Sequence, residues 1–347
     1  MATKLYTILF LLTITAGSVS SQTITAGDAA ANPGEKISGF LYVQEGSDGP
    51  EVRIPVTVVN GVRPGPALAL IAGTHGYEYA PIIALQRVKQ ELESEALSGT
   101  VIIVHIANMP SFTRRTIYLN PYDWKNLNRA YPGKIDGSMT ERIAYTISKE
   151  VIDQSDYVID NHCGDGNEDL TTYLYYTETG NPGIDRVTRE LALNFGFKLL
   201  IHERAQADEP AASWCANSAL FKGKPALTVE CGKLGRTDET DIGAIVNGTY
   251  NTLKYLDMID GNPEKMFESI WVEKTMYVYA EHDGLFYPLV KAGQHVQQGE
   301  MAGYLTDYFG NVIQKAYAPQ DGIVMYIVAT PPMSAGGPMV KVGGFSR

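Results

Sequence analysis

Residues 67–81 read Ala-Leu-Ala-Leu-Ile-Ala-Gly-Thr-His-Gly-Tyr-Glu-Tyr-Ala-Pro, and this stretch decides the fold of the chain. Its apolar first part, 67–72, is typical of a buried strand, and the apolar residues at 82–85 open a helical pattern. Two glycines without a Cβ let the backbone turn tightly between strand and helix. His75 and Glu78 therefore lie on a strand-to-helix turn.

The same alternation of strands and helices continues along the chain. It predicts an α/β fold with a mainly parallel mixed sheet flanked by helices. The predicted elements are a hairpin over 37–59, helices over 81–95, 139–152, 185–195, 213–221 and 238–258, and strands over 101–106, 157–160, 171–176, 198–201 and 226–229.

Composition divides the chain into four predicted parts. Residues 1–20 are typical of a signal peptide, with Lys4 before an apolar segment and small residues at its end. The alternative is an uncleaved anchor. A linker is predicted over 21–36, a catalytic domain over 37–259, and a small all-β domain over 264–347. The last part resembles a biotinyl/lipoyl hammerhead without the Met-Lys-Met carrier motif, which favours a cap beside the catalytic site.

Overall charge excludes some partners. The 347 residues carry a net charge of −11, which disfavours nucleic acid and anionic membranes, because both attract basic surfaces. No later stretch is long enough to cross a bilayer. We expect an exported protein, periplasmic or extracellular, that leaves the membrane after signal cleavage. Export permits one disulfide among Cys163, Cys215 and Cys231, whose pairing stays open, as does a homo-oligomer.

Three predicted strands end in polar side chains, and in open α/β sheets ligands gather at the carboxyl ends of strands. His75 and Glu78 follow the first strand, Asp160-Asn161-His162 ends the second, and Glu230 ends the third. Two histidines and one carboxylate form a catalytic zinc site with an open position for water, although another divalent metal stays open. The alternatives are a turn histidine, a surface glutamate and a packed histidine.

Glu230 is the candidate general base. Zinc lowers the pKa of its water to about 7, and a nearby carboxylate can accept the proton as the water attacks a carbonyl. A buried, ion-paired glutamate is the alternative.

The long segment 108–137 is dense in Asn, Pro, Arg and Tyr, and a loop of this length is usually functional. A guanidinium binds a carboxylate through two parallel hydrogen bonds, and a second arginine near the metal could stabilise an oxyanion. Each arginine taken singly could equally be a solvated surface residue. The candidates in this segment are Arg114, Arg115, Asn126, Asn128 and Arg129.

Four motifs together resemble the succinylglutamate desuccinylase/aspartoacylase family, a branch of the zinc carboxypeptidase-like fold. They lie at 73–81, 126–133, 160–162 and 229–232, and the likeness runs from about Pro66 to the C-terminus. The resemblance implies one zinc ion per chain, held by His75, Glu78 and His162, with Glu230 as base. It further implies that Asn128 and Arg129 hold a substrate carboxylate, and that Arg114 or Arg115, with Arg115 favoured, polarises the scissile carbonyl.

Two departures from the family pattern bear on the substrate and the metal. Asn126 stands where relatives often have Asp, a residue that supports a zinc-binding histidine; Asn can still accept a hydrogen bond but brings no charge. Asp160 is assigned the same supporting role. The segment 164–168 resembles a broad subgroup without a common substrate, so the substrate is not inherited.

These observations predict a zinc-dependent hydrolase that cleaves an amide bond of a small, carboxylate-bearing N-acyl amino acid. One alternative is an exported metallocarboxypeptidase acting on peptides. An alternative of another class is a zinc-containing binding or adaptor protein, although a pure binder has no need for the base Glu230. The acyl group, the amino acid released and any esterase activity stay open.

Overall fold

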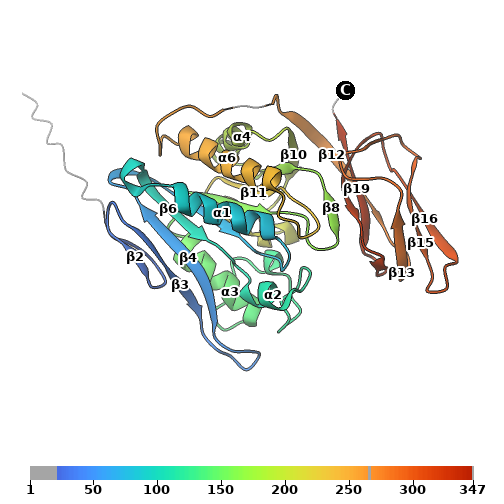
Figure 1. Ribbon diagram of the computed structural model, residues 1–347, viewed down its shortest axis with the longest axis horizontal. Coiled ribbons are helices and arrows are strands. Elements are labelled where there is room, and N and C mark those ends of the chain that lie inside the picture. Colours follow the sequence, from blue (N-terminus) through green and yellow to red (C-terminus); the bar gives the residue numbers. More distant parts are fainter. Residues whose placement is uncertain (1–21, 265–266, 346–347) are drawn as a thin grey trace, which may run out of the picture.

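The computed structural model describes residues 22–264 and 267–345, so the predicted signal peptide over 1–20 lies outside the described residues. A 13-stranded mixed sheet runs through the molecule (Figure 1) in the order β14-β17-β19-β12-β10-β9-β11-β7-β5-β6-β4-β3, with β8 paired to β17. Within the described ranges no helix is long and apolar enough to cross a membrane. The strands of the N-terminal part of this sheet are β3 (Lys36–Val43), β4 (Val52–Asn60), β5 (Arg63–Ala72), β6 (Ser98–Val104), β7 (Tyr157–His162), β8 (Glu168–Leu170), β9 (Tyr173–Glu178), β10 (Leu199–Arg204) and β11 (Ala226–Glu230).

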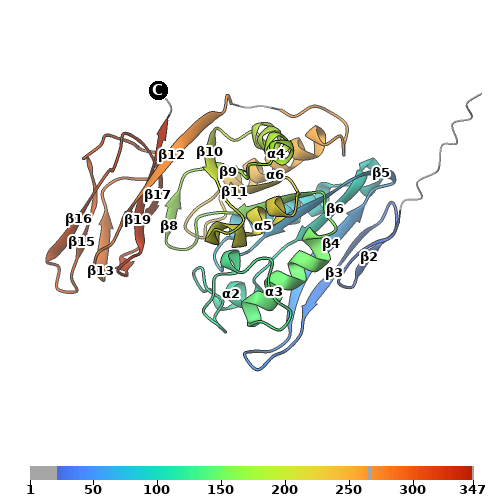
Figure 2. The same ribbon diagram turned by 180° about the vertical axis from the view of Figure 1, so that it is seen from behind.

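Helices cover both faces of this part of the sheet, as Figures 1 and 2 show from opposite sides. Strand β5 explains why: Leu68 and Leu70 pack into one apolar core, while Ala69 and Ile71 pack into the other. Successive side chains of a strand point to opposite faces, so a continuous apolar run needs cover on both. The predicted α/β fold is confirmed. One face carries α1 (Tyr79–Glu91), α4 (Pro182–Phe195) and α6 (Glu239–Tyr255), and the other carries α3 (Met139–Ile147) and α5 (Cys215–Phe221).

Strands β5, β7 and β11 pair in parallel, so their carboxyl ends meet at one edge. The register places Ala72 beside Asn161 and His162 beside Glu230. The side chains predicted to bind the metal and to act as the base therefore lie at this edge.

The C-terminal part is all-β, as predicted, and it extends the same sheet. Strand β12 (Ile270–Tyr279) pairs in parallel with β10 and antiparallel with β19 (Pro338–Phe345), so hydrogen bonding continues across the expected boundary near 260–263. The other strands are β13 (Gly284–Pro288), β14 (His295–Val296), β15 (Met301–Thr306), β16 (Val312–Tyr317), β17 (Gly322–Val328) and β18 (Pro332–Met333), of which β13, β15, β16 and β18 form a separate four-stranded sheet.

Two predictions about irregular segments differ from the structure. The expected linker contains a two-stranded hairpin, β1 (Ile24–Ala26) and β2 (Ala29–Ala31), in which Ala26, Ala29 and Ala31 are buried and Ala30 is exposed. Small side chains are enough to bury this hairpin because it packs against the main sheet, and the local sequence does not reveal that contact. The long segment 108–137 contains α2 (Met109–Arg114), whose start Asn108 accepts a hydrogen bond from Ser111 N. The three cysteines are buried and, within the described ranges, unpaired.

Candidate metal centre

The turn between β5 and α1 presents His75 and Glu78 to the same point. Gly73 has a φ of 70°, and a Cβ on Gly76 would lie 2.2 Å from the carbonyl oxygen of Thr116, so both positions require glycine. The backbone N–H of His75 donates to Glu78 Oε2 at 3.0 Å. This contact fixes the turn before the helix begins.

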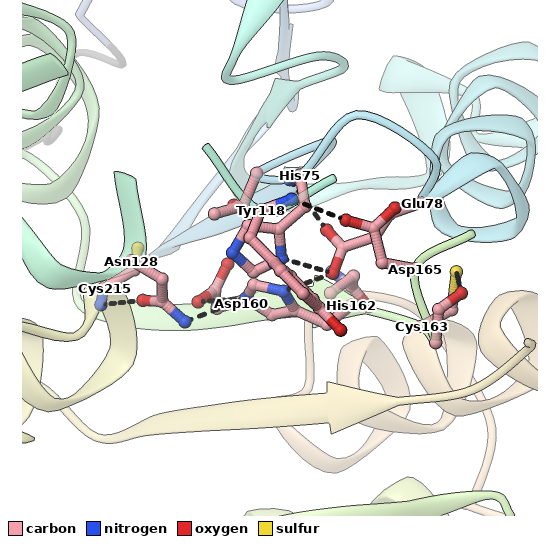
Figure 3. A network of polar contacts seen from close by, with 12 residues as sticks. His75, Glu78, Tyr118, Asn128, Asp160, His162, Cys163, Asp165 and Cys215 are labelled. Atoms are coloured by element: carbon pink, nitrogen blue, oxygen red, sulfur yellow. Dashed lines mark hydrogen bonds and ion pairs between the residues drawn. The ribbon is translucent and has the colours of Figure 1, made fainter. Parts of the chain in front are cut away.

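His162 completes a three-residue group from the neighbouring strand (Figure 3). Glu78 Oε1 lies 2.8 Å from His75 Nδ1 and 2.9 Å from His162 Nδ1. One ligand atom from each residue lies within 4.8 Å of the other two. The structure therefore brings together the three side chains predicted to bind the ion, and all three are buried.

Polar groups contact the far nitrogen of each histidine. Asn126 Oδ1 lies 3.1 Å from His75 Nε2, and Asp160 Oδ2 lies 2.9 Å from His162 Nε2. Each oxygen accepts the Nε2–H, which leaves Nδ1 of each ring as the electron-pair donor facing Glu78. Asn126 and Asp160 thus contact the two histidines in the way expected of residues that orient metal-binding histidines.

This donor set fits a zinc ion. Two imidazole nitrogens and one carboxylate oxygen, with an open fourth position, match the ligands of catalytic zinc. Burial acts to raise the pKa of Glu78, yet the two adjacent histidines lower it, and Glu78 together with Asp160 raises the pKa of His162 against the effect of burial. Protons and a metal ion compete for these same nitrogens.

Glu230 stands at the end of β11 beside His162 and lines the cavity at the group. Burial raises its pKa to about 8. A carboxyl whose pKa lies close to neutral pH can both accept and return a proton, which is what a general acid–base catalyst does.

The cavity has a volume of about 600 Å³. Arg129 and Trp214 both line it, and the guanidinium stacks 4.7 Å from the indole ring. One guanidinium nitrogen donates to the Asn128 carbonyl at 2.7 Å, and within the described ranges no carboxylate pairs with Arg129. The Asn128 Oδ1 accepts from Cys215 N at 2.7 Å, so its amide nitrogen is the atom left to face a ligand. The remaining guanidinium N–H groups and the Asn128 amide N–H can therefore donate hydrogen bonds to an anion.

The other two arginines do not line the cavity. Arg114 is exposed and directs its guanidinium to Tyr122, donating to the hydroxyl at 2.8 Å. Arg115 is also exposed, and its φ of 52° turns the chain as α2 ends. Neither side chain lines the cavity in this structure, and the assignment of Arg115 or Arg114 to the scissile carbonyl stays a prediction.

The sequence favours a C-terminal cap beside the catalytic site, but it does not predict which C-terminal residues line the cavity. Lys341 of β19 is 1% exposed, and its ammonium donates to the Tyr175 hydroxyl at 2.7 Å. Glu203 lies 4.0 Å from it. A lysine in a short β run is usually taken as solvent-facing, so only the long-range pairing of β19 reveals it. The other C-terminal residues lining the cavity are Tyr277, Tyr326, Val328, Pro332, Met333, Ser334, Gly337 and Pro338.

Comparison with known proteins agrees with this geometry. Residues 64–256 match the model of the succinylglutamate desuccinylase/aspartoacylase catalytic domain. The chain belongs to this family. A curated relative, the N-alpha-acetyl-L-2,4-diaminobutyric acid deacetylase of Halomonas elongata, is 32% identical over 262 residues, which cover 74% of this chain and 75% of the relative.

Solved structures share the fold over nearly the whole chain. A succinylglutamate desuccinylase/aspartoacylase from Rhodobacter sphaeroides superposes with a TM-score of 0.79 at 25% identity, covering 90% of this chain and 96% of that one. The product-bound ectoine utilization protein EutE from Ruegeria pomeroyi gives 0.80 at 24% identity, covering 89% and 95%. The likeness includes the C-terminal β region, because the covered share extends well beyond the catalytic domain.

Proposed function

We propose that this family member is a zinc-dependent hydrolase that cleaves the amide bond of a small N-acyl amino acid. The observation that carries the proposal is the convergence of His75, Glu78 and His162 within 4.8 Å, with Glu230 beside His162 in the same cavity. The family supports an amide hydrolase, and the Halomonas relative is named for the deacetylation of an acylated amino acid.

The three-residue group would hold the ion, which when bound supplies a Lewis acid for the carbonyl oxygen and acidifies water. Glu230 accepts the proton of the attacking water and returns it to the amine nitrogen as the C–N bond breaks. Positioned proton transfer of this kind contributes typically about 10²–10⁴-fold to the rate. The elevated pKa of Glu230 suits both steps, accepting the proton from water and returning it to the amine.

Arg129 anchors the substrate carboxylate in this proposal, and Asn128 adds an amide N–H. The stacking on Trp214 holds the guanidinium plane in place, so less conformational entropy is lost on binding. A carboxylate held there lies on the Asn128 side of the group, next to His162, since Asn128 Nδ2 is 3.3 Å from His162 Nε2.

The test is hydrolysis of a panel of N-acyl amino acids by purified, zinc-loaded protein, with Glu230→Gln as the matched control. We expect turnover by the native protein and a loss of at least about 100-fold in kcat for the variant. Equal, background-level rates for both proteins would refute the proposal. N-acetyl amino acids and peptides that end in the same residue separate the two functions, because a deacylase cleaves the short acyl group whereas a carboxypeptidase cleaves the peptide.

We also propose that the protein is exported, on the basis of the signal-like pattern over residues 1–20. Sequencing the N-terminus of protein recovered from the native host tests this. A mature N-terminus near residue 21 is expected, whereas an intact Met1 on protein in the cytosolic fraction would contradict export.

A further inference from the structure

A buried lysine of the C-terminal β region has no part in the reaction proposed so far. Lys341 lies on β19, which joins the main sheet through β12 (Figure 1). It lines the cavity at the metal group, yet only 1% of the residue is exposed. Burying a charged side chain costs free energy unless polar partners compensate. The contacts of this ammonium group therefore bear on what it does.

Two polar groups partner the ammonium of Lys341. Its Nζ donates to the Tyr175 hydroxyl at 2.7 Å, and Glu203 Oε1 lies 4.0 Å away. The ring centroids of Tyr175, Tyr277 and Tyr173 lie 4.7, 5.1 and 5.7 Å from Nζ. Attraction between the cation and these rings adds to the hydrogen bond and holds the lysine side chain in one place. Tyr175, which is only half-buried, is the member of the pair that is open to the cavity.

The direction of this hydrogen bond leaves the proton of the Tyr175 hydroxyl for another partner. An ammonium group has donors only, so the Tyr175 oxygen must accept. By distance and angle, this is the one hydrogen bond of that hydroxyl within 22–264 and 267–345. An O–H group whose oxygen accepts from a cation is polarised and becomes a stronger donor. An oxygen of a ligand in the cavity can accept this proton.

Arg129 lies near the same hydroxyl. Burial lowers the pKa of Arg129, and the neighbouring Tyr175 and Tyr277 act in the opposite direction. All three side chains line the cavity. A carboxylate has about four lone-pair positions, of which the Arg129 guanidinium can fill two and the Asn128 amide one. One position is left for a further donor, and Tyr175 offers an oriented one.

We propose that Tyr175 is a further substrate-binding residue, whose hydroxyl donates to the carboxylate held by Arg129, and that Lys341 is the positioning residue that orients this hydroxyl. The inference rests on the proposed hydrolase function, in which Arg129 anchors the substrate carboxylate. Through this pair, strand β19 of the C-terminal β region takes part in selecting substrates with a free carboxylate.

The experiment compares Nα-acetyl-L-methionine with its primary carboxamide, which keeps the shape but lacks the negative charge. Where another N-acyl amino acid of the panel is turned over faster, that compound and its carboxamide are used instead. Tyr175→Phe should raise KM for the acid about 10- to 100-fold, the range for a hydrogen bond to a charged group, and leave kcat within about 3-fold. The kcat/KM for the carboxamide should also stay within about 3-fold. Equal losses for acid and carboxamide would overturn the role of Tyr175.

A double-mutant cycle tests whether Lys341 acts through Tyr175. Lys341→Met alone should raise KM for the acid about 3- to 10-fold, because the hydroxyl loses its orientation and polarisation. In the Tyr175→Phe background the same change should add less than about 2-fold. The full loss repeated in the double variant would overturn the positioning role. Circular dichroism checks folding, and Lys341→Gln, which keeps a neutral N–H donor, replaces Lys341→Met if that variant does not fold.

Product binding gives a readout apart from turnover. Calorimetry with the products, L-methionine and L-methioninamide for the first pair, should show weaker binding of the acid to Tyr175→Phe and unchanged binding of the amide. A preference for the acid that is unchanged in Tyr175→Phe would overturn this inference alone. No turnover of any acylated amino acid by the native protein would instead overturn the hydrolase proposal.

Discussion

The Asp160→Asn substitution tests how the metal centre is held. Asp160 is fully buried, and its Oδ2 lies 2.9 Å from His162 Nε2. The change preserves size but removes the negative charge that makes the imidazole a better donor. Loss of such a supporting carboxylate typically weakens metal binding about 10- to 100-fold, which corresponds to about 1.4–2.7 kcal/mol. We expect the zinc dissociation constant to rise by this factor.

The opposite substitution, made in the residue that contacts the other histidine, gives a matched comparison. Asn126→Asp places a charge 3.1 Å from His75 Nε2 and still accepts from Asn128 N at 2.8 Å. Zinc affinity should therefore increase, by up to about 10-fold. Both constants are measured at pH 8 by competition with a chromophoric chelator, with circular dichroism to confirm folding. A constant unchanged within 2-fold in Asp160→Asn, alongside lost binding in Glu78→Gln, would refute the reasoning.

Three further predictions follow from buried groups. Because Glu230 must be ionised to accept a proton, kcat/KM should rise with pH. Burial raises the pKa of Glu230 to about 8 and a bound cation lowers it, so the midpoint of the rise should fall between 4.5 and 8. A flat pH profile would contradict the role of Glu230 as base. Lys341→Met leaves the Tyr175 hydroxyl without its cation and should lower the free energy of unfolding by about 1.5–3 kcal/mol in urea titrations; unchanged stability would show the contact to be neutral. Gly248→Ala would put a Cβ 2.1 Å from Phe195 Cε1. The steric overlap should destabilise the protein by about 1–3 kcal/mol and outweigh a gain of about 1 kcal/mol in helix propensity, so we expect a lower Tm. A raised Tm would contradict the packing of Gly248 against Phe195.

Sequence patterns predicted the framework of the centre because that framework depends on local periodicity. Residues 67–72 are apolar without interruption, and parallel strands place their carboxyl ends together, so the convergence of His75 and His162 follows from period and topology. The direction of Arg115 does not, because its positive φ arises from how α2 ends against the rest of the fold. In the folded chain Arg129 lines the cavity, whereas Arg114 and Arg115 do not.

The sequence does not predict which C-terminal residues line the cavity, and the cause is a different one. Lys341 lies 166 residues from Tyr175 in the chain, and their contact exists because β19 continues the sheet through β12 and β10. Periodicity describes each strand alone and carries no information on which strands pair at such distances. The small hairpin at 24–31 lies in the predicted linker for the same reason: its buried alanines contact distant parts of the chain.

The most direct test of the central claim is a crystal structure of zinc-loaded protein with diffraction data collected on both sides of the zinc absorption edge. We expect one anomalous peak at about 2.0–2.2 Å from His75 Nδ1, from a Glu78 carboxylate oxygen and from His162 Nδ1. Glu230 should line the open side of the ion. A peak held by other residues, or no peak at saturating zinc, would contradict the assignment of this group as a metal centre.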